Sequence, residues 1–194
     1  MLASHRLPTS RVIRLNHARK FSLLSTHTSF PATMYRFQLH RNATLYDASQ
    51  EETRHRKDGI KVSEDGLVHA MISKSSPYSN GPIFMPNSRL MQQILQFDFS
   101  HYQEGVDDGK PMLDPTVICI QKGTIIPPAL VLWREGLSRF SLQPSKPIEV
   151  ETLNNVLTEF YEKSATVVGA EEWIQKHPYR ESFADQNEQG WMEA

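Results

Sequence analysis

Short runs that alternate between apolar and polar residues, or that are rich in β-branched residues, dominate the middle of the chain. A period of two is typical of a strand with one buried face. Valine, isoleucine and aromatic residues favour strands for the same reason, because they fit a pleated and half-buried surface. These runs predict strands starting at Tyr35 and covering residues 60–62, 67–71, 116–120, 129–135 and 139–144. Turn-forming segments separate most of them.

Apolar residues at helical spacing predict three helices. The first covers residues 88–97, and residues 101–115 after it are expected to form a polar loop. The strongest pattern lies in residues 147–163, where a proline precedes and acidic residues occupy the first turn. The segment of residues 170–178 predicts a short third helix that ends before Pro178. Strands joined by short turns, with few helices, predict an α+β fold with a largely antiparallel sheet.

One predicted strand carries a polar stripe opposite an apolar one. Arg139, Ser141 and Gln143 fall on one side of the run, and Phe140 and Leu142 fall on the other. Successive side chains of a strand point to opposite faces of the sheet. We therefore expect the apolar pair to enter a core and the three polar side chains to lie together on the other face.

The charges of the chain are distributed unevenly. Seven basic residues and no acidic residue precede Asp47, and the rest of the chain has 14 basic and 22 acidic residues, a net charge of −8. Residues 1–33 are rich in arginine, serine and threonine and have no continuous apolar region, which is typical of a mitochondrial presequence. A disordered tail is an alternative. So is an upstream extension of the reading frame, with Met34 as the start of the domain.

These observations predict three parts of the chain. Residues 1–33 form a basic leader, residues 34–180 form a single domain, and residues 181–194 form a polar C-terminal tail. A chain of 194 residues is long enough for one domain with a substantial core. The location is the mitochondrial matrix if the leader is functional, and the cytoplasm otherwise.

Several classes of function are disfavoured by composition. The acidic body argues against nucleic-acid binding, which requires clustered positive charge. No window approaches the roughly 18 consecutive apolar residues of a membrane helix, so no membrane partner is expected. The single cysteine, Cys119, lies in an apolar run and is interpreted as a core thiol. The eight histidines are scattered without ligand spacing, so no metal site is expected.

An ordered series of short motifs resembles a known toxin family. Each motif is weak alone, but their order and spacing over residues 34–165 are fairly specific. The matching residues are Tyr35-Arg36, Asp65-Gly66-Leu67, Gly123-Thr124, Ile126-Pro127-Pro128, Leu130, Phe140, Pro144, Lys146 and Pro147. The series resembles the ADP-ribosyltransferase-like toxins typified by the bacterial type VI secretion effector called exported toxin two, and more closely its fungal relatives.

The resemblance implies an ADP-ribosyltransferase-like fold, with two small, mostly antiparallel sheets around a cleft that holds NAD and helices on the outside. It implies NAD as a substrate, an unknown acceptor of ADP-ribose, and an immunity protein as a partner. It suggests two sets of site residues, one binding NAD and one on the opposite, catalytic wall. The first set is Arg36, Tyr35, Ser79, Asn80 and Phe84, and the second is Arg139, Ser141 and Gln143.

The sequence departs from the superfamily pattern at the catalytic carboxylate. Related enzymes usually carry a glutamate on the late strand, whereas the polar stripe of residues 139–143 contains no acid. Glu149 and Glu151 have the spacing of an acid pair, but they fall on a predicted helix, where they compensate its dipole. Glu135, which follows a strand, is the remaining alternative. Two functions therefore stay open for the domain: an NAD-dependent transferase, or an inactive binding protein with the same fold. A third, a mitochondrial structural or assembly protein, rests only on the leader.

Overall fold

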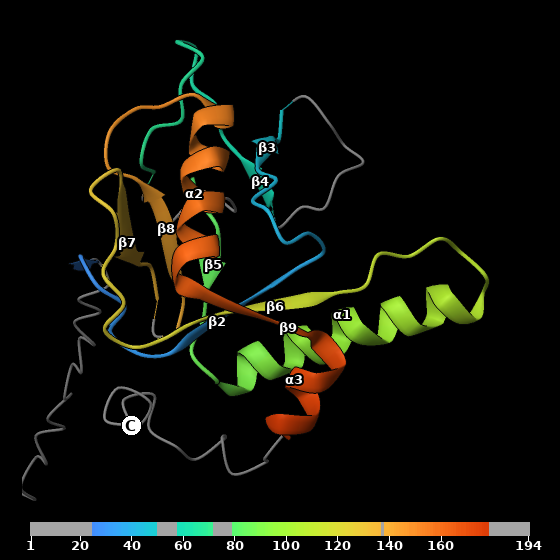
Figure 1. The fold of residues 1–194 in the computed structure, drawn as a ribbon. Coiled ribbons are helices and arrows are strands. Elements are labelled where there is room, and N and C mark those ends of the chain that lie inside the picture. The colour runs from blue at the N-terminus through green and yellow to red at the C-terminus, as the bar shows by residue number, and fades with distance from the viewer. Residues whose placement is uncertain (1–24, 50–57, 72–78, 137, 179–194) are drawn as a thin grey trace, which may run out of the picture.

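The computed structural model describes residues 25–49, 58–71, 79–136 and 138–178. Within these ranges the chain forms three helices and nine strands (Figure 1). The helices are α1 (Arg89–Asp107), α2 (Val150–Ser164) and α3 (Ala170–Lys176). The strands are β1 (Ser25–His27), β2 (Met34–Gln38), β3 (Tyr46–Asp47), β4 (Gly59–Ile60), β5 (Ile83–Phe84), β6 (Thr116–Ile120), β7 (Leu130–Arg134), β8 (Phe140–Pro144) and β9 (Ala165–Gly169). None of the helices in these ranges is long and apolar enough to cross a membrane.

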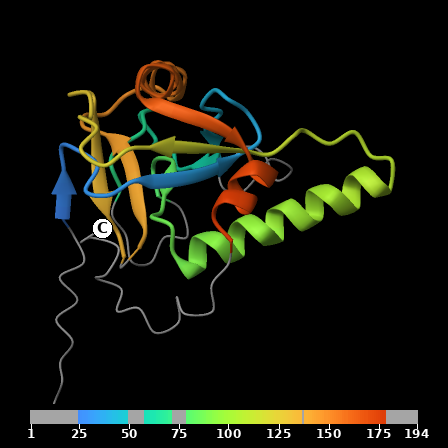
Figure 2. The same ribbon diagram turned by 60° about the horizontal axis from the view of Figure 1, so that its bottom comes forward.

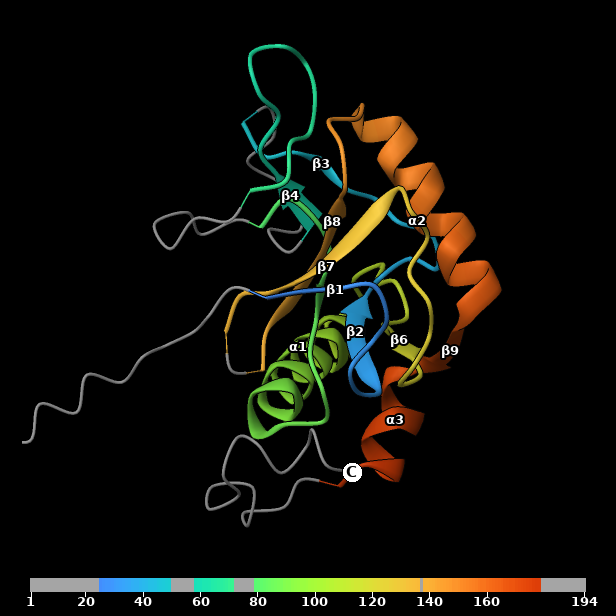
Figure 3. The same cartoon turned by 90° about the vertical axis from the view of Figure 1, so that its left-hand side faces the viewer.

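The strands form two antiparallel sheets and one small parallel pair. The four-stranded sheet has the order β1-β7-β8-β5, and the three-stranded sheet has the order β2-β6-β9. Strands β3 and β4 pair in parallel, at the end of the molecule opposite to α1 and α3 (Figure 3). The strands of the two larger sheets run across one another in Figure 1. The α+β fold predicted from the sequence is confirmed.

Two backbone hydrogen bonds join the larger sheets. The N–H of Tyr35 in β2 donates to the carbonyl of Met85 at 2.7 Å, and the N–H of Met85 donates back at 3.0 Å. Met85 directly follows β5, the edge strand of the four-stranded sheet. The backbone hydrogen bonding therefore continues from the four-stranded sheet to the three-stranded sheet. This connection holds the two sheets in one relative orientation.

The three-stranded sheet separates two apolar cores. Helix α2 packs on one face and α1 and α3 pack on the other (Figure 2). Alternation along β2 and β6 supplies side chains to both cores: Met34 and Ile118 enter the core with α2, and Phe37 and Val117 enter the core with α1 and α3. Strand β2 is therefore buried on both sides, and its two faces have different neighbours.

Three predicted boundaries need correction. Residues 25–33, assigned to the leader, belong to the fold, because β1 pairs with β7 and Phe30 is 1% exposed in the core. The expected start of the domain at residue 34 is therefore too late. Helix α1 continues to Asp107, through the first part of the predicted polar loop. Strand β9 was not predicted, because it begins at the residue after α2 ends, with no turn to mark it.

The strand predicted over residues 67–71 is wrong, because the segment makes only an isolated bridge between Val68 and Ile148, and the strand predicted over 60–62 is the shorter β4. The remaining boundaries agree with the sequence or lie outside the described ranges. Strands β2, β6, β7 and β8 and helices α2 and α3 are found where the patterns predict them. The presequence interpretation covers residues 1–33, of which residues 1–24 form one segment, and the predicted C-terminal tail, residues 181–194, forms another. Both segments lie outside the described residues.

Gly81 is required where the chain approaches the middle of β8. A Cβ atom at this position would lie 2.0 Å from the carbonyl oxygen of Leu142 and 2.7 Å from its carbonyl carbon. Both atoms are backbone, and the next residue, Pro82, accepts a hydrogen bond from the Leu142 N–H. We expect Gly81→Ala to lower the free energy of unfolding by about 2 kcal/mol, because the strands must separate. Urea denaturation of the purified variant measures this change.

Gly169 provides the control for this substitution. A Cβ at Gly169 meets nothing within 4 Å, and its φ of −63° suits any residue. Gly169→Ala should leave stability unchanged or slightly improved. Equal denaturation midpoints for the two variants would show that the close approach at Gly81 does not limit stability.

Candidate active site

The polar stripe of β8 is present in the fold as the alternation predicts. Phe140 and Leu142 belong to the core under α2. Ser141 and Gln143 lie on the opposite face and are fully buried. Arg139 precedes the strand and is half exposed. These three polar side chains therefore share one face of the four-stranded sheet.

A carboxylate, that of Glu135, lies at the centre of this stripe. Glu135 follows β7, and its backbone N–H donates to the carbonyl of Arg139 at 2.9 Å, which continues the hairpin ladder beyond the strands. Residues paired across an antiparallel ladder present their side chains on the same face. Glu135 therefore points to the face of Ser141 and Gln143, although it is six and eight residues away from them in the chain.

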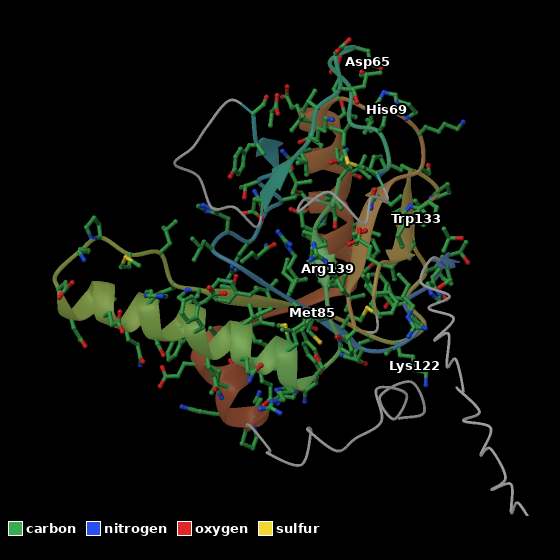
Figure 4. The ribbon with its side chains drawn as sticks, turned by 180° about the vertical axis from the view of Figure 1, so that it is seen from behind. Asp65, His69, Met85, Lys122, Trp133 and Arg139 are labelled. Carbon is green, nitrogen blue, oxygen red and sulfur yellow. The ribbon has the colours of Figure 1, made fainter. Side chains whose placement is uncertain are left out.

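Four side chains surround the two oxygens of Glu135. On Oε1, the hydroxyl of Ser141 donates at 2.5 Å and the amide of Gln143 at 3.2 Å. On Oε2, the hydroxyl of Ser79 donates at 2.6 Å, and Nε of Arg139 lies 3.2 Å away as an ion pair. We call Glu135, Ser79, Arg139, Ser141 and Gln143 the carboxylate cluster. Figure 4 labels Arg139 near the middle of the molecule.

Additional hydrogen bonds hold the buried members of the cluster in place. The amide of Gln143 donates to Ser141 Oγ at 2.7 Å and to the carbonyl of Met71 at 3.0 Å, and it accepts from the Met71 N–H at 2.7 Å. Nη2 of Arg139 donates to Ser79 Oγ at 3.2 Å. The carboxylate of Glu135 is only 15% exposed. Charge-assisted hydrogen bonds of this kind fix both the position and the orientation of a carboxylate.

Arg36 lies in a second polar group, on the face of β2 that looks toward α2. Its guanidinium is 5% exposed, forms an ion pair with Asp58, and donates from Nε to Gln38 at 3.1 Å. The hydroxyl of Tyr161 is also buried here and has no hydrogen-bond partner among the residues that the structure describes. Burial raises the pKa of Tyr161 far above its usual value, against the opposing effect of the Arg36 charge. In this arrangement the charge of Arg36 is already neutralised by Asp58.

Two of the predicted NAD-binding residues are part of the apolar cores. Tyr35 lies on the opposite face of β2 from Arg36, where its ring packs edge-on against Trp173 at 5.0 Å. Phe84 is fully buried, and its ring packs against Phe30 and Tyr161. The positions of Tyr35 and Phe84 indicate packing roles, and the structure does not bring them together with the carboxylate cluster.

Asn80 connects three backbone groups. Its side-chain oxygen accepts from the Lys61 N–H at 2.9 Å, and its amide donates to the carbonyls of Lys61 at 3.0 Å and His69 at 2.7 Å. The side chain is fully buried. All three of these hydrogen bonds are to the protein backbone, so Asn80 holds residues 61–69 against the turn that carries Ser79.

The role of Asn80 can be separated from ligand binding. We expect Asn80→Ala to lower the free energy of unfolding by about 2 kcal/mol, because three buried backbone groups lose their partner. If the protein binds NAD, as the resemblance implies, the affinity measured by titration calorimetry at a temperature where the variant is folded should change little. An unchanged denaturation midpoint together with weaker NAD binding would instead assign Asn80 to the binding site.

Three other candidate side chains, those of Cys119, Glu149 and Glu151, lie outside the carboxylate cluster. Cys119 is half-buried in β6, and burial raises the pKa of its thiol, which disfavours the nucleophilic thiolate. Glu149 and Glu151, the alternative acid pair, are exposed at the start of α2. Among the residues that the structure describes, no group of three or more His, Cys, Asp or Glu side chains could hold a metal ion.

Comparison with known proteins identifies the family. The family model described as Tse2 ADP-ribosyltransferase toxin matches residues 32–173. The chain belongs to this family. The match includes all five members of the carboxylate cluster, and it begins before residue 34, in agreement with the position of the first core residues. No curated protein and no solved structure matches the chain.

The family assignment confirms the resemblance and the ADP-ribosyltransferase-like fold. From the sequence, Glu135 is one alternative source of the acid, and Arg139, Ser141 and Gln143 form a wall without an acid. The hairpin register could have identified Glu135, because a short turn between two strands pairs the residues that flank it. Only the tertiary structure adds Ser79 to the same carboxylate, from 56 residues away.

Proposed function

We propose that this protein cleaves the bond between nicotinamide and ribose in NAD and transfers ADP-ribose to an acceptor. The carboxylate cluster carries the proposal: a buried carboxylate, Glu135, held by Ser79, Ser141 and Gln143 and bordered by one half-exposed cation, Arg139. Membership of an ADP-ribosyltransferase toxin family supports NAD as the substrate.

The chemistry requires stabilisation of a cation. As the C1′–N1 bond of NAD breaks, nicotinamide leaves with the electron pair, and the ribose acquires oxocarbenium character, as in glycoside hydrolysis. A fixed carboxylate beside the ribose stabilises this positive charge without reorganising during the reaction. The acceptor then forms a bond to C1′ and releases a proton. In this proposal Glu135 is the stabilising carboxylate.

The buried donors preorganise Glu135. Ser141 and Gln143 hold Oε1, and Ser79 holds Oε2, from three different positions in the chain. Their own positions are determined by β8 and by the backbone of Met71. The carboxylate is therefore oriented before any ligand binds, which is how a site of this type lowers the barrier.

The alternative function, an inactive binding protein, was motivated by the absence of an acid from the polar stripe. Glu135 removes that motivation, because it lies hydrogen-bonded to two of the stripe residues, Ser141 and Gln143. We therefore favour the transferase.

The proposal is tested with the purified full-length chain and two labelled forms of NAD. Label in the nicotinamide reports cleavage as free nicotinamide, and label in the adenosine reports transfer to macromolecules of a cell extract. We expect nicotinamide release and labelled acceptor in the same samples. Neither binding nor cleavage at millimolar NAD would overturn the proposed function.

A further inference from the structure

Arg139 differs from the other three residues that contact Glu135. The side chain of Arg139 is 45% exposed, whereas Ser79 is 8% exposed and Ser141 and Gln143 are fully buried. Its contact with Oε2 is an ion pair at 3.2 Å, which is longer than the 2.6 Å hydrogen bond from Ser79 to the same oxygen. Ion pairs this exposed are weak, because water competes for both charges.

Side chains already surround the carboxylate of Glu135 before any ligand binds. Ser79, Ser141 and Gln143 donate hydrogen bonds to it, and the guanidinium of Arg139 lies against Oε2 as an ion pair. A ribose hydroxyl that binds at Oε2 therefore competes with Arg139 for that oxygen. Gln143 is tied to Met71 by two hydrogen bonds, and Ser141 is fixed within β8. Arg139 alone can move into solvent without leaving a buried polar group unpaired.

An arginine that leaves Glu135 becomes an unpaired cation beside the bound ligand. NAD has a pyrophosphate attached to the same ribose whose C1′ reacts. Guanidinium groups bind phosphate oxygens through charge-assisted and often bidentate hydrogen bonds. Arg36, expected from the sequence to bind the phosphates, is 5% exposed and paired with Asp58, so it does not offer a free charge to a ligand.

We propose that Arg139 is a specificity-determining residue that exchanges the carboxylate of Glu135 for the pyrophosphate of the substrate. A ligand with a phosphate recovers the ion pair that it breaks. A nucleoside that lacks phosphates displaces Arg139 without this compensation. The site therefore selects a pyrophosphate-bearing dinucleotide over the corresponding nucleoside. This inference rests on the proposed function, because it assumes that the ribose of NAD binds at Glu135.

The test compares NAD with nicotinamide riboside, which has the same ribose and base but no phosphate. Titration calorimetry measures the dissociation constants of both ligands for the unmodified protein, for Arg139→Gln and for Arg139→Lys. Arg89→Gln is the matched control, because Arg89 is an exposed arginine at the start of α1. Circular dichroism and thermal unfolding confirm that each variant is folded.

We expect Arg139→Gln to weaken NAD binding by about tenfold or more, which is the effect of losing one charge-assisted hydrogen bond. The same change should leave nicotinamide riboside binding unchanged or tighter, because the competing cation is gone. Arg139→Lys should recover part of the preference for NAD, and Arg89→Gln should behave as the unmodified protein.

Two results would overturn the inference about Arg139. A similar loss of affinity for both ligands in Arg139→Gln would assign Arg139 to maintaining the cluster and would overturn the inference. Unchanged NAD affinity would also overturn it. If the unmodified protein binds neither ligand, the inference and the proposed function both fail. If it binds NAD but Arg139→Gln does not discriminate between the two ligands, only the inference fails.

Discussion

Glu135→Gln is expected to reduce the rate of nicotinamide release from NAD by a factor on the order of a hundred to a thousand. Glutamine has nearly the same shape as glutamate, and its oxygen still accepts hydrogen bonds from Ser141 and Gln143. It lacks the negative charge that would stabilise the oxocarbenium character of the ribose. The expected loss is therefore in kcat, measured at saturating NAD.

Glu149→Gln is the matched control for this prediction. Glu149 is the exposed N-cap residue of α2, and its pair with Glu151 was the alternative source of the catalytic acid. Its substitution should leave the rate of nicotinamide release unchanged. A rate that falls in Glu149→Gln and persists in Glu135→Gln would move the catalytic carboxylate to the start of α2 and contradict the proposed mechanism.

Folding of the Glu135→Gln variant has to be measured in parallel. The substitution removes the partner of Arg139 and places an amide near the Ser79 hydroxyl, so some loss of stability is expected. Because hydroxyl groups both donate and accept, Ser79 can rotate and accept from the new amide. We expect a small decrease in melting temperature that is too slight to explain the loss of rate.

Asp58→Ala is expected to lower the free energy of unfolding by about 3 kcal/mol or more. Arg36 is 5% exposed, and removal of Asp58 takes away the counter-ion that it has among the described residues. Breaking one side of a buried ion pair costs more than the pair itself contributes, because the remaining charge has lost both water and its partner. Urea denaturation monitored by circular dichroism measures the change.

Two further variants distinguish this explanation from a general sensitivity of the fold. The double variant Asp58→Ala with Arg36→Met removes both charges, and it should be more stable than Asp58→Ala alone. Glu159→Ala breaks an exposed ion pair with Lys163 on α2, and exposed pairs of this kind contribute little. A double variant no more stable than Asp58→Ala would show that the unpaired charge of Arg36 is not the cause of the loss.

These two predictions concern polar groups on two different sheets. Arg36 belongs to β2 of the three-stranded sheet, and Asp58 is the residue before β4. Glu135 and its partners belong to the β7–β8 hairpin and to the turn at Ser79. Loss of the ion pair between Arg36 and Asp58 should lower the free energy of unfolding. Loss of the Glu135 carboxylate should lower the rate of nicotinamide release.

Local patterns in the sequence determined much of the secondary structure and the family. Alternation predicted β2, β7 and β8, and helical spacing predicted α2, because these periods follow directly from backbone geometry. The same alternation correctly placed Arg139, Ser141 and Gln143 on one face. The ordered short motifs were sufficient to recognise the ADP-ribosyltransferase toxin family, which the family match confirms.

Contacts between distant residues were decided only by the tertiary structure. The pairing of β1 with β7 brings residues 25–27 into the fold, and Asp58 neutralises Arg36 from 22 residues away. The carboxylate of Glu135 meets Ser79 across 56 residues. No local period encodes such contacts, because they depend on strand register and on which buried charges must be paired. The sequence by itself therefore determined the family and the polar stripe, and the fold determined which carboxylate that stripe surrounds.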